Sequence, residues 1–454
     1  MRWSALVALL PLTITLAAAA EQTREHKLKN GLRVIVKEDH RAPTLVSMVW
    51  YKAGSMDEFN GTTGVAHVLE HMMFKGTKTV PGGQFSKIIA AAGGRDNAFT
   101  AKDMTAYHQQ LHKSQLQLAF RLEADRMANL ILSKQEFDKE IKVVMEERRL
   151  RTDDKPHSLV YEQLMATAFT AHPYRAPIIG WMNDLENMDW RDARGWYDRW
   201  YAPNNAIVVV AGDVDPKQVF ALAEKYFGAL KPKALPERKP QDEPAQRGIH
   251  RVTVKAPAEQ PYLLMGYRAP VLRDVERDWE PYALEMLAGV LDGHDAARFN
   301  STLVRGEKIA DEVSASYDST QRGPGMFMVS GVPATGRTIA ELEQGLRREL
   351  MKVVTDGVSD DELKRVKAQV IASQVFQRDS VFYQAMQIGS LEIAGYPHQS
   401  IDLMIRKLQQ VTPAQVQEVA KKYLVDDSLT IAVLDPQPLD DRKPAAPKGL
   451  RHAQ

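Results

Sequence analysis

The sequence predicts an α+β protein made of two related modules, each an α/β sandwich in which helices pack on an antiparallel-rich sheet. Both halves of the chain open with a strand-like segment of alternating character, at residues 32–37 and 250–255. Long helical patterns fill the interior of each half, and an apolar strand ends it. A proline-rich, charged stretch, Pro232 to Gly248, separates the two halves as a linker.

The first residues resemble a secretory leader. Arg2 precedes an apolar run over residues 5–20, which ends in the small residues Ala18 and Ala20. The run is short for a membrane span, and an uncleaved anchor is the alternative interpretation. We therefore expect residues 1–20 to be a signal peptide of an exported protein, periplasmic or secreted, with no stable membrane insertion after cleavage.

Composition excludes several classes of function. The 454 residues carry a net charge of +1, so nothing indicates binding to nucleic acid or to a membrane surface. The chain has no cysteine, which excludes disulfides, thiolate catalysis and cysteine-ligated metals. A mature chain of about 430 residues exceeds one ordinary core, in agreement with two modules.

The expected modules are an N-terminal one at 21–231 and a C-terminal one at 249–436, joined by the linker at 232–248 and followed by a flexible tail at 437–454. Each module ends with a helix, a polar turn and an apolar strand. The similarity is faint, and coincidence between two generic α/β segments is the alternative to duplication. Helices are predicted at 115–131, 134–150, 338–354 and 360–376.

The segment His67-Val-Leu-Glu70-His71 is the strongest chemical signal in the chain. Residues at i, i+3 and i+4 of a helix share one face, so the two imidazoles and the carboxylate point the same way. Two neutral imidazoles at this spacing can bind zinc, and the glutamate can accept a proton from metal-bound water. The glycine-containing turn at 61–64 and Gly76 delimit the predicted helix. A solvated helix face with two incidental histidines is the alternative.

A catalytic zinc needs a third protein ligand, which in a cysteine-free chain must be His, Asp or Glu. The helical pattern at 134–150 offers Glu140, Glu146 and Glu147. Glu140 and Glu147 lie two turns apart on one face, so a helix that aims one at the metal can aim the other at a ligand histidine. Spacing alone does not choose among the three, and ion pairs with neighbouring Lys and Arg residues are the alternative.

These motifs resemble those of the inverzincins, the family of pitrilysin, insulin-degrading enzyme and mitochondrial processing peptidase. The resemblance covers essentially the whole mature chain. It rests on four stretches, which are His67–Thr77, Gly93–Tyr107, Glu140 with Glu147, and Tyr201–Asn205.

The resemblance implies a zinc metalloendopeptidase of the short, two-module branch, whose chains form half of a clam-shell chamber. It selects Glu147 over Glu146 as the third ligand beside His67 and His71. It implies one zinc per chain, Glu140 as the partner of a ligand histidine, and Glu70 as general base on zinc-bound water. The substrates would be peptides or unfolded polypeptide segments.

The stretch Asn97-Ala98-Phe99 resembles the family's edge strand, which receives an extended peptide by strand addition. Main-chain pairing of this kind gives affinity with little sequence choice. Ordinary turn and core roles are the alternative for Asn97 and Phe99.

The C-terminal module departs from the family pattern. Arg305 matches an arginine that contacts substrate, but Asp311 or Glu312 stands where the family has a tyrosine. This module also has no His-x-x-Glu-His motif. The resemblance therefore implies a zinc-bearing subunit whose homologous partner chain supplies the Arg/Tyr pair, with a homodimer as the alternative. The competing function is a non-catalytic scaffold or peptide-binding subunit of a larger peptidase-like assembly.

Overall fold

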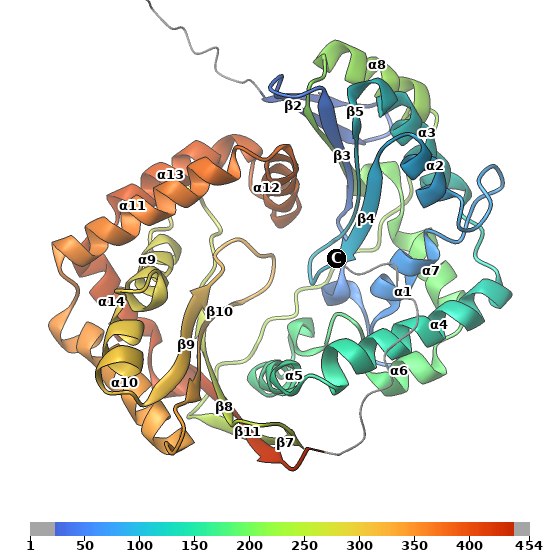
Figure 1. The fold of residues 1–454 in the computed structure, drawn as a ribbon. Helices are drawn as coiled ribbons and strands as arrows, with labels where there is room; N and C mark the ends of the chain where they lie inside the picture. The colour runs from blue at the N-terminus through green and yellow to red at the C-terminus, as the bar shows by residue number, and fades with distance from the viewer. Residues whose placement is uncertain (1–22, 440–454) are drawn as a thin grey trace, which may run out of the picture.

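The computed structural model describes residues 23–439, which form two halves, each built on one mixed sheet with helices packed against it (Figure 1). The predicted signal peptide and most of the predicted tail lie outside these residues. The first sheet has six strands, in the spatial order β1 (Thr23–Lys27), β2 (Arg33–Glu38), β6 (Ala206–Gly212), β3 (Thr44–Tyr51), β5 (Thr105–His112) and β4 (Arg95–Thr100).

The second sheet repeats the topology of the first with one strand fewer. Its order is β7 (His250–Pro257), β11 (Leu429–Gln437), β8 (Tyr262–Ala269), β10 (Gly325–Pro333) and β9 (Ala310–Tyr317). Each sheet has one parallel pair, β2 with β6 and β7 with β11, which in both cases includes the last strand of that half. The other pairs are antiparallel. The prediction of two related, antiparallel-rich modules is thereby confirmed.

Helices of the first half cover one face of its sheet and enclose the larger core. Buried side chains such as Phe120 and Trp196 fill the space between helices and sheet. The helices are α1 (Val65–Met72), α2 (Phe85–Ala91), α3 (Leu116–Asn129), α4 (Lys134–Arg148), α5 (Pro156–Ala168), α6 (Met182–Asn187), α7 (Trp190–Trp200) and α8 (Pro216–Phe227), with short turns η1 (Ser55–Asp57), η2 (Lys113–Gln115), η3 (Arg149–Asp153), η4 (Pro173–Arg175) and η5 (Pro203–Asn205).

The second half has a separate core on one face of its own sheet, with Leu287, Phe327 and Leu346 among its buried members. Its helices are α9 (Glu280–Asp292), α10 (Ile339–Asp356), α11 (Asp360–Gln377), α12 (Val381–Ala394), α13 (Ile401–Gln410) and α14 (Pro413–Tyr423), with short turns η6 (Asn300–Gly306), η7 (His398–Ser400) and η8 (Asp426–Ser428). The four predicted helical stretches correspond to α3, α4, α10 and α11, with ends shifted by a few residues.

One helix of each half packs against the sheet of the other half. Helix α12 packs on β3 and β6, where Ile388 joins a buried cluster with Trp50. Helix α5 packs on β7, β8 and β11, where Leu164 joins a cluster with Leu264 and Ala432. Both faces of the two sheets are therefore covered, which explains why β3 is mostly apolar and buried on both faces from Leu45 to Tyr51.

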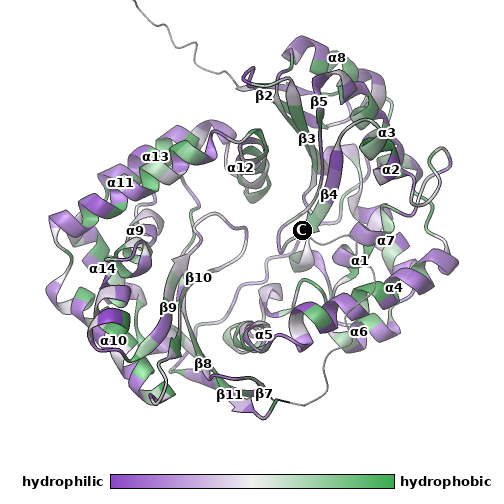
Figure 2. Cartoon of the chain, in the orientation of Figure 1, coloured by the Kyte–Doolittle hydropathy of each residue, from purple (hydrophilic) through white to green (hydrophobic). Residues whose placement is uncertain are grey.

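Strand β4 forms one edge of the first sheet among the described residues, and β1 forms the other. The sequence of β4, Arg-Asp-Asn-Ala-Phe-Thr, is mainly polar, and Figure 2 shows it as more hydrophilic than the central strand β3. Five of its six residues are only half-buried. The edge therefore offers unpaired backbone groups beside a polar surface.

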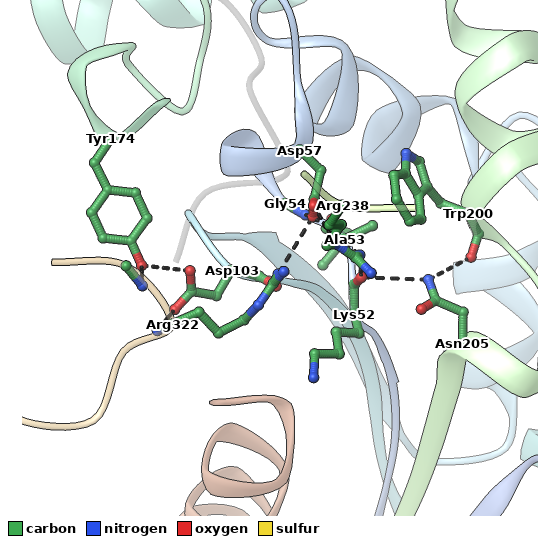
Figure 3. Close-up of polar contacts among 12 residues, drawn as sticks. Lys52, Ala53, Gly54, Asp57, Asp103, Tyr174, Trp200, Asn205, Arg238 and Arg322 are labelled. Atoms are coloured by element: carbon green, nitrogen blue, oxygen red, sulfur yellow. Dashed lines mark hydrogen bonds and ion pairs between the residues drawn. The ribbon is translucent and has the colours of Figure 1, made fainter. Parts of the chain in front are cut away.

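The segment between the halves, residues 231–249, contains no helix or strand but is held in place. Arg238 pairs with Asp57 at 2.6 Å, and its guanidinium lies over the Trp200 ring, 4.3 Å from the ring centroid (Figure 3). The Glu243 carboxylate accepts hydrogen bonds from the amides of Thr170 and His172, each at 2.8 Å. The connection is docked on the first half along part of its length.

Candidate metal centre

Helix α1 carries the His-x-x-Glu-His motif, and specific contacts fix the residue at which this helix begins. Gly64 precedes the helix with φ 87°, and a Cβ there would lie 2.5 Å from the carbonyl oxygen of Ile179. The two carboxyl oxygens of Glu58 accept hydrogen bonds from the amides of Gly64 and Ala66, both at 2.8 Å. These contacts satisfy amides that a helix start leaves without internal partners.

One face of α1 packs in the core, and the other lines a cavity. Val68, Leu69 and Met72 are fully buried in the core of the first half. His67 and His71 lie on the other side, where they line a cavity of about 730 Å³ together with Glu70. The sequence pattern predicted this helix and the shared direction of its three polar side chains.

Helix α4 brings the carboxylates. It begins at the capping residue Ser133, whose hydroxyl accepts a hydrogen bond from the amide of Glu136. Glu140 and Glu147 face the cavity, with side chains that are 11% and 10% exposed. Glu146 points to solvent, 59% exposed, and pairs with Arg149. The helix phase therefore separates the two neighbouring glutamates.

Three ligand atoms from the two helices converge on one point. The Oε2 atom of Glu147 lies 3.2 Å from Nε2 of His71 and 3.7 Å from Nε2 of His67. All three atoms lie within 4.8 Å of one another. Tetrahedral zinc with bonds of about 2.0–2.2 Å separates its ligand atoms by about 3.3–3.6 Å. The separations of 3.2 and 3.7 Å lie close to this range, and the donor types are those that bind zinc.

The His71 ring has a fixed orientation. Its Nδ1 atom lies 3.0 Å from Oε1 of Glu140, whose other oxygen pairs with Lys75 at 2.5 Å. When Nδ1 donates its proton to Glu140, the Nε2 atom of the neutral ring is the one available to bind a metal ion. The corresponding Nδ1 of His67 is buried without a hydrogen-bond partner among residues 23–439.

Glu70 lies in the same cavity but outside the three-ligand group. Its Oε2 atom accepts a hydrogen bond of 2.5 Å from the hydroxyl of Thr100, the last residue of β4. This hydrogen bond therefore holds the Glu70 carboxylate at the end of the edge strand β4. The sequence offered no signal for this contact, because 30 residues separate its partners.

Burial and charge push the pKa values in this cluster apart. Burial lowers the pKa of His67 to about 3 and raises that of Glu70 to about 7. Burial also opposes the charged form of His71, but hydrogen bonds with Glu140 and Glu147 raise its pKa to about 9. A carboxylate with a pKa near neutrality can both accept and release a proton.

Other residues suggested by the sequence lie at different distances from this cluster. Asn97, Ala98 and Phe99 line the cavity along β4. The Phe99 ring also contacts Trp50 edge-to-face, with centroids 5.6 Å apart, so it has a core role as well. Arg305, in η6, does not line this cavity, and its guanidinium donates to the backbone oxygen of Asp295 at 2.6 Å.

The positions expected to hold a tyrosine lie on β9, the edge strand of the second sheet. Asp311 and Glu312 are both exposed there, and the Asp311 carboxylate accepts a hydrogen bond from Gln260. Sequence reasoning missed Arg151, which pairs with Glu147 at 2.7 Å. Its spacing of four residues from Glu147 is the signal that could have indicated it.

Family models match both halves of the chain. Residues 33–181 match the insulinase domain, peptidase family M16, and residues 188–370 match the peptidase M16 inactive domain. The chain belongs to the M16 family of peptidases. The name of the second domain agrees with the lack of a second His-x-x-Glu-His motif in residues 188–370.

Individual relatives support this placement along the chain. The zinc protease PqqE of Helicobacter pylori is 32% identical over 420 residues, 90% of this chain and 92% of that protein. The uncharacterized zinc protease YmxG of Bacillus subtilis is 26% identical over 91% of this chain and 98% of that one. These names support a zinc-dependent peptidase.

Solved structures agree with the fold. A protease from Helicobacter pylori superposes with a TM-score of 0.86 and 29% identity, over 92% of this chain and all of that one. The first half of the periplasmic protease PqqL from Escherichia coli, at 22% identity, shares the fold with a TM-score of 0.77 over 91% of this chain and 92% of that one. In the part of the chain that the structure describes, no helix is long and apolar enough to cross a membrane.

Proposed function

We propose that this chain is a zinc-dependent endopeptidase that hydrolyses peptides or unfolded polypeptide segments. The convergence of His67, His71 and Glu147 carries the proposal, because Glu70 lies beside them in the same cavity and is not needed as a ligand. A structural zinc site usually closes its coordination with four protein ligands. Three ligands and a neighbouring free carboxylate are typical of a hydrolytic site.

When bound, zinc would act as a Lewis acid that polarises a peptide carbonyl. It would also lower the pKa of water, so that the water can lose a proton and attack near neutral pH. Glu70 accepts the proton of the attacking water and returns it to the leaving amine. The Thr100 hydroxyl holds the Glu70 carboxylate in place through their 2.5 Å hydrogen bond. Glu140 orients His71 from its far side.

The free edge of β4 is the proposed docking strand for substrate. An extended peptide that pairs with Arg95–Thr100 lies along the cavity wall formed by Asn97, Ala98 and Phe99. The strand ends at Thr100, next to Glu70, so a paired peptide passes the acid with its backbone extended. We therefore expect cleavage of peptides and unfolded segments in preference to folded proteins.

Replacement of Glu70 tests the proposal directly. We expect Glu70→Gln to abolish hydrolysis of a quenched fluorescent peptide and to leave about one zinc per chain, because the amide keeps the shape but cannot take the proton. Zinc is measured by mass spectrometry on the purified protein. Glu136→Gln, at a partly exposed residue in the first turn of α4 and away from the cavity, serves as the matched control.

The same measurements separate the competing functions. A wild-type protein that does not bind zinc and does not cleave peptides is a scaffold. Zinc without hydrolysis, both alone and with a partner chain, indicates a structural metal in a peptide-binding subunit. Substantial activity of a contaminant-free Glu70→Gln preparation removes the general-base role.

The proposal includes a second chain. Asp311 and Glu312 occupy the expected tyrosine position, and Arg305 is engaged with Asp295. A homologous chain with the Arg/Tyr pair would complete the site from the opposite side, and a second copy of this chain is the alternative.

We also propose export. The leader-like segment 1–20 supports it, although that segment lies outside the described residues, and PqqL of Escherichia coli is described as periplasmic. Mass spectrometry of the chain recovered from its native cells checks whether residues 1–20 are removed.

A further inference from the structure

Lys102 lies at the tip of the β4–β5 hairpin, two residues beyond Thr100. Its carbonyl oxygen accepts a hydrogen bond of 2.9 Å from the amide of Met56, and that of Ala101 accepts one of 3.1 Å from Ser55. A Cβ at Gly54 would lie 2.5 Å from the carbonyl oxygen of Lys102. The glycine thus permits close backbone packing that fixes the hairpin tip.

Both halves of the molecule hold this tip. The Asp103 carboxylate accepts hydrogen bonds from the Tyr174 hydroxyl at 2.5 Å and from the backbone amide of Arg322 at 2.8 Å. The Arg322 guanidinium donates to the carbonyl oxygen of Asp103 at 3.0 Å, and Figure 3 shows these three residues joined in one network. Lys102 therefore projects from a rigid backbone.

The Lys102 side chain lies in the cavity between two aromatic rings. Its Nζ atom is 4.5 Å from the centroid of Tyr174 and 5.9 Å from that of Tyr161. It donates one hydrogen bond, of 3.4 Å, to the Tyr161 hydroxyl. No carboxylate of residues 23–439 lies within ion-pair distance of it. An ammonium has three donors, so the charge remains available to a ligand.

Over the described part of the chain, charged groups without an opposite partner lie at both ends of β4, an acidic one near its start and basic ones beyond its end. Asp96, at the start of the strand, is bonded to the Ser86 hydroxyl and faces no cation at ion-pair distance among the described residues. Arg175 lines the cavity with Lys102 and donates to the oxygens of Thr170 and Asn60, not to a carboxylate. Three glutamates of the cavity already pair with other cations: Glu140 with Lys75, Glu147 with Arg151 and Glu162 with Arg148.

We propose that Lys102 determines specificity by favouring peptides that carry a carboxylate two or three residues from the cleaved bond. The cleaved bond must lie next to Glu70, which is hydrogen-bonded to Thr100 at the end of β4. Lys102 lies in the turn two residues past Thr100, the end of β4, so its side chain lies close to substrate positions two or three residues from the bond beside Glu70. The inference rests on the proposed peptidase function and names the substrate class for that site.

Binding to the Glu70→Gln protein tests this without turnover. Fluorescence anisotropy compares peptides of one sequence, blocked at both ends, with Glu, Gln or Lys two or three residues to either side of the cleaved bond. We expect the Glu peptide to bind about tenfold more tightly than the Gln peptide, the size of one charge-assisted hydrogen bond. The preference should arise on one side of the cleaved bond only.

Substitutions of Lys102 identify the source of the preference. In the Glu70→Gln background, Lys102→Met should reduce the Glu/Gln ratio to about one, and Lys102→Glu should favour the Lys peptide. Lys134→Met, an exposed lysine at the start of α4, should leave the ratio unchanged. Melting temperatures confirm that each variant is folded. A Gln peptide with a free C-terminus shows whether a terminal carboxylate serves as well as a side chain.

The outcomes separate the two proposals. Equal binding of the Glu, Gln and Lys peptides, or a Glu/Gln ratio that survives Lys102→Met, overturns the role of Lys102. Cleavage by the wild-type chain without any acidic preference leaves the peptidase proposal standing and removes this inference alone. A protein that neither binds nor cleaves any of the peptides, alone or with a homologous partner chain, overturns both.

Discussion

Neighbouring residues in the candidate metal centre differ in role because a helix turns by about 100° at each step. Glu147 is buried against both histidines, whereas Glu146 is exposed and pairs with Arg149. The two side chains have the same chemistry and stand in the same sequence environment. Only their direction distinguishes them.

We predict that Glu147→Gln weakens zinc binding about 100-fold or more, whereas Glu146→Gln leaves it unchanged. The amide removes one anionic ligand from the three that converge. Competition with a chromogenic chelator measures both affinities. Equal loss in the two variants, or a greater loss at Glu146, would show that another residue completes the site.

At the scale of single elements, the exchange of α5 and α12 decides how the sheets are covered. Helix α12 crosses the outer face of the first sheet at a point of very close approach. A Cβ on Gly389 would lie 2.0 Å from the ring of Trp50, which is fully buried on β3. The helix can lie this near the strand only because position 389 has no side chain.

We predict that Gly389→Ala lowers the melting temperature by about 5 °C, since overpacking of this kind costs about 2 kcal/mol. Gly195→Ala, in the interior of α7, is the control. A Cβ there meets only the far end of Arg199 at 4.0 Å, so better helix propensity should raise the melting temperature slightly. Scanning calorimetry measures both. A stabilised Gly389→Ala protein would contradict the packing described for α12.

At the scale of the whole molecule, ionic contacts join the two halves. Arg33 on β2 pairs with Glu392 on α12 at 2.6 Å, and His398 donates to the same carboxylate. Arg322 of the second half reaches Asp57 and Asp103 of the first half beside the cavity (Figure 3). The cavity that contains His67, Glu70 and His71 therefore borders the contact between the two halves.

Acid should weaken this contact. Burial opposes ionisation of Glu392, but hydrogen bonds from His398 and Arg33 lower its pKa to about 2, against an ordinary value near 4.5. A depressed carboxyl pKa contributes stability above pH 4.5 that is lost as the pH falls towards 2. We predict that Glu392→Gln lowers the melting temperature at pH 7, with a loss of about 2 kcal/mol.

The difference from wild type should shrink as the pH falls from 4.5 towards 2. Glu418→Gln, at an exposed position of α14, is the control and should match wild type at every pH. Melting curves recorded across this range measure the effect. A difference that is constant with pH would assign the destabilisation to lost packing and not to the charge.

A further whole-molecule prediction concerns the second chain. The isolated protein should cleave peptides very slowly, because orienting groups contribute several kcal/mol to lowering a barrier, about 7–11 for well-aligned reactants. A homologous chain with the Arg/Tyr pair should raise the rate strongly when added. Peptide assays on mixtures, with size-exclusion chromatography, measure both rate and assembly. A monodisperse, fully active preparation without any second chain would rule out the heterodimer.

Local patterns in the sequence were enough for the helices that carry the candidate site. The positions of His67, Glu70 and His71 predict one helix face, and the spacing of Glu140 and Glu147 predicts another. The repeated strand patterns predicted two related modules, which the two sheets confirm. Such features depend on neighbours within one or two turns, so the order of residues specifies them directly.

Only the tertiary structure decided which elements meet. The contact of Thr100 with Glu70, the position of Lys102 between two tyrosines and the exchange of α5 and α12 join segments that lie far apart in the chain. Spacing left Glu146 and Glu147 equivalent, and the choice of Glu147 came from the family resemblance. The physical reason is that periodicity defines which face of an element is apolar, whereas the partner of that face depends on the packing of the whole chain.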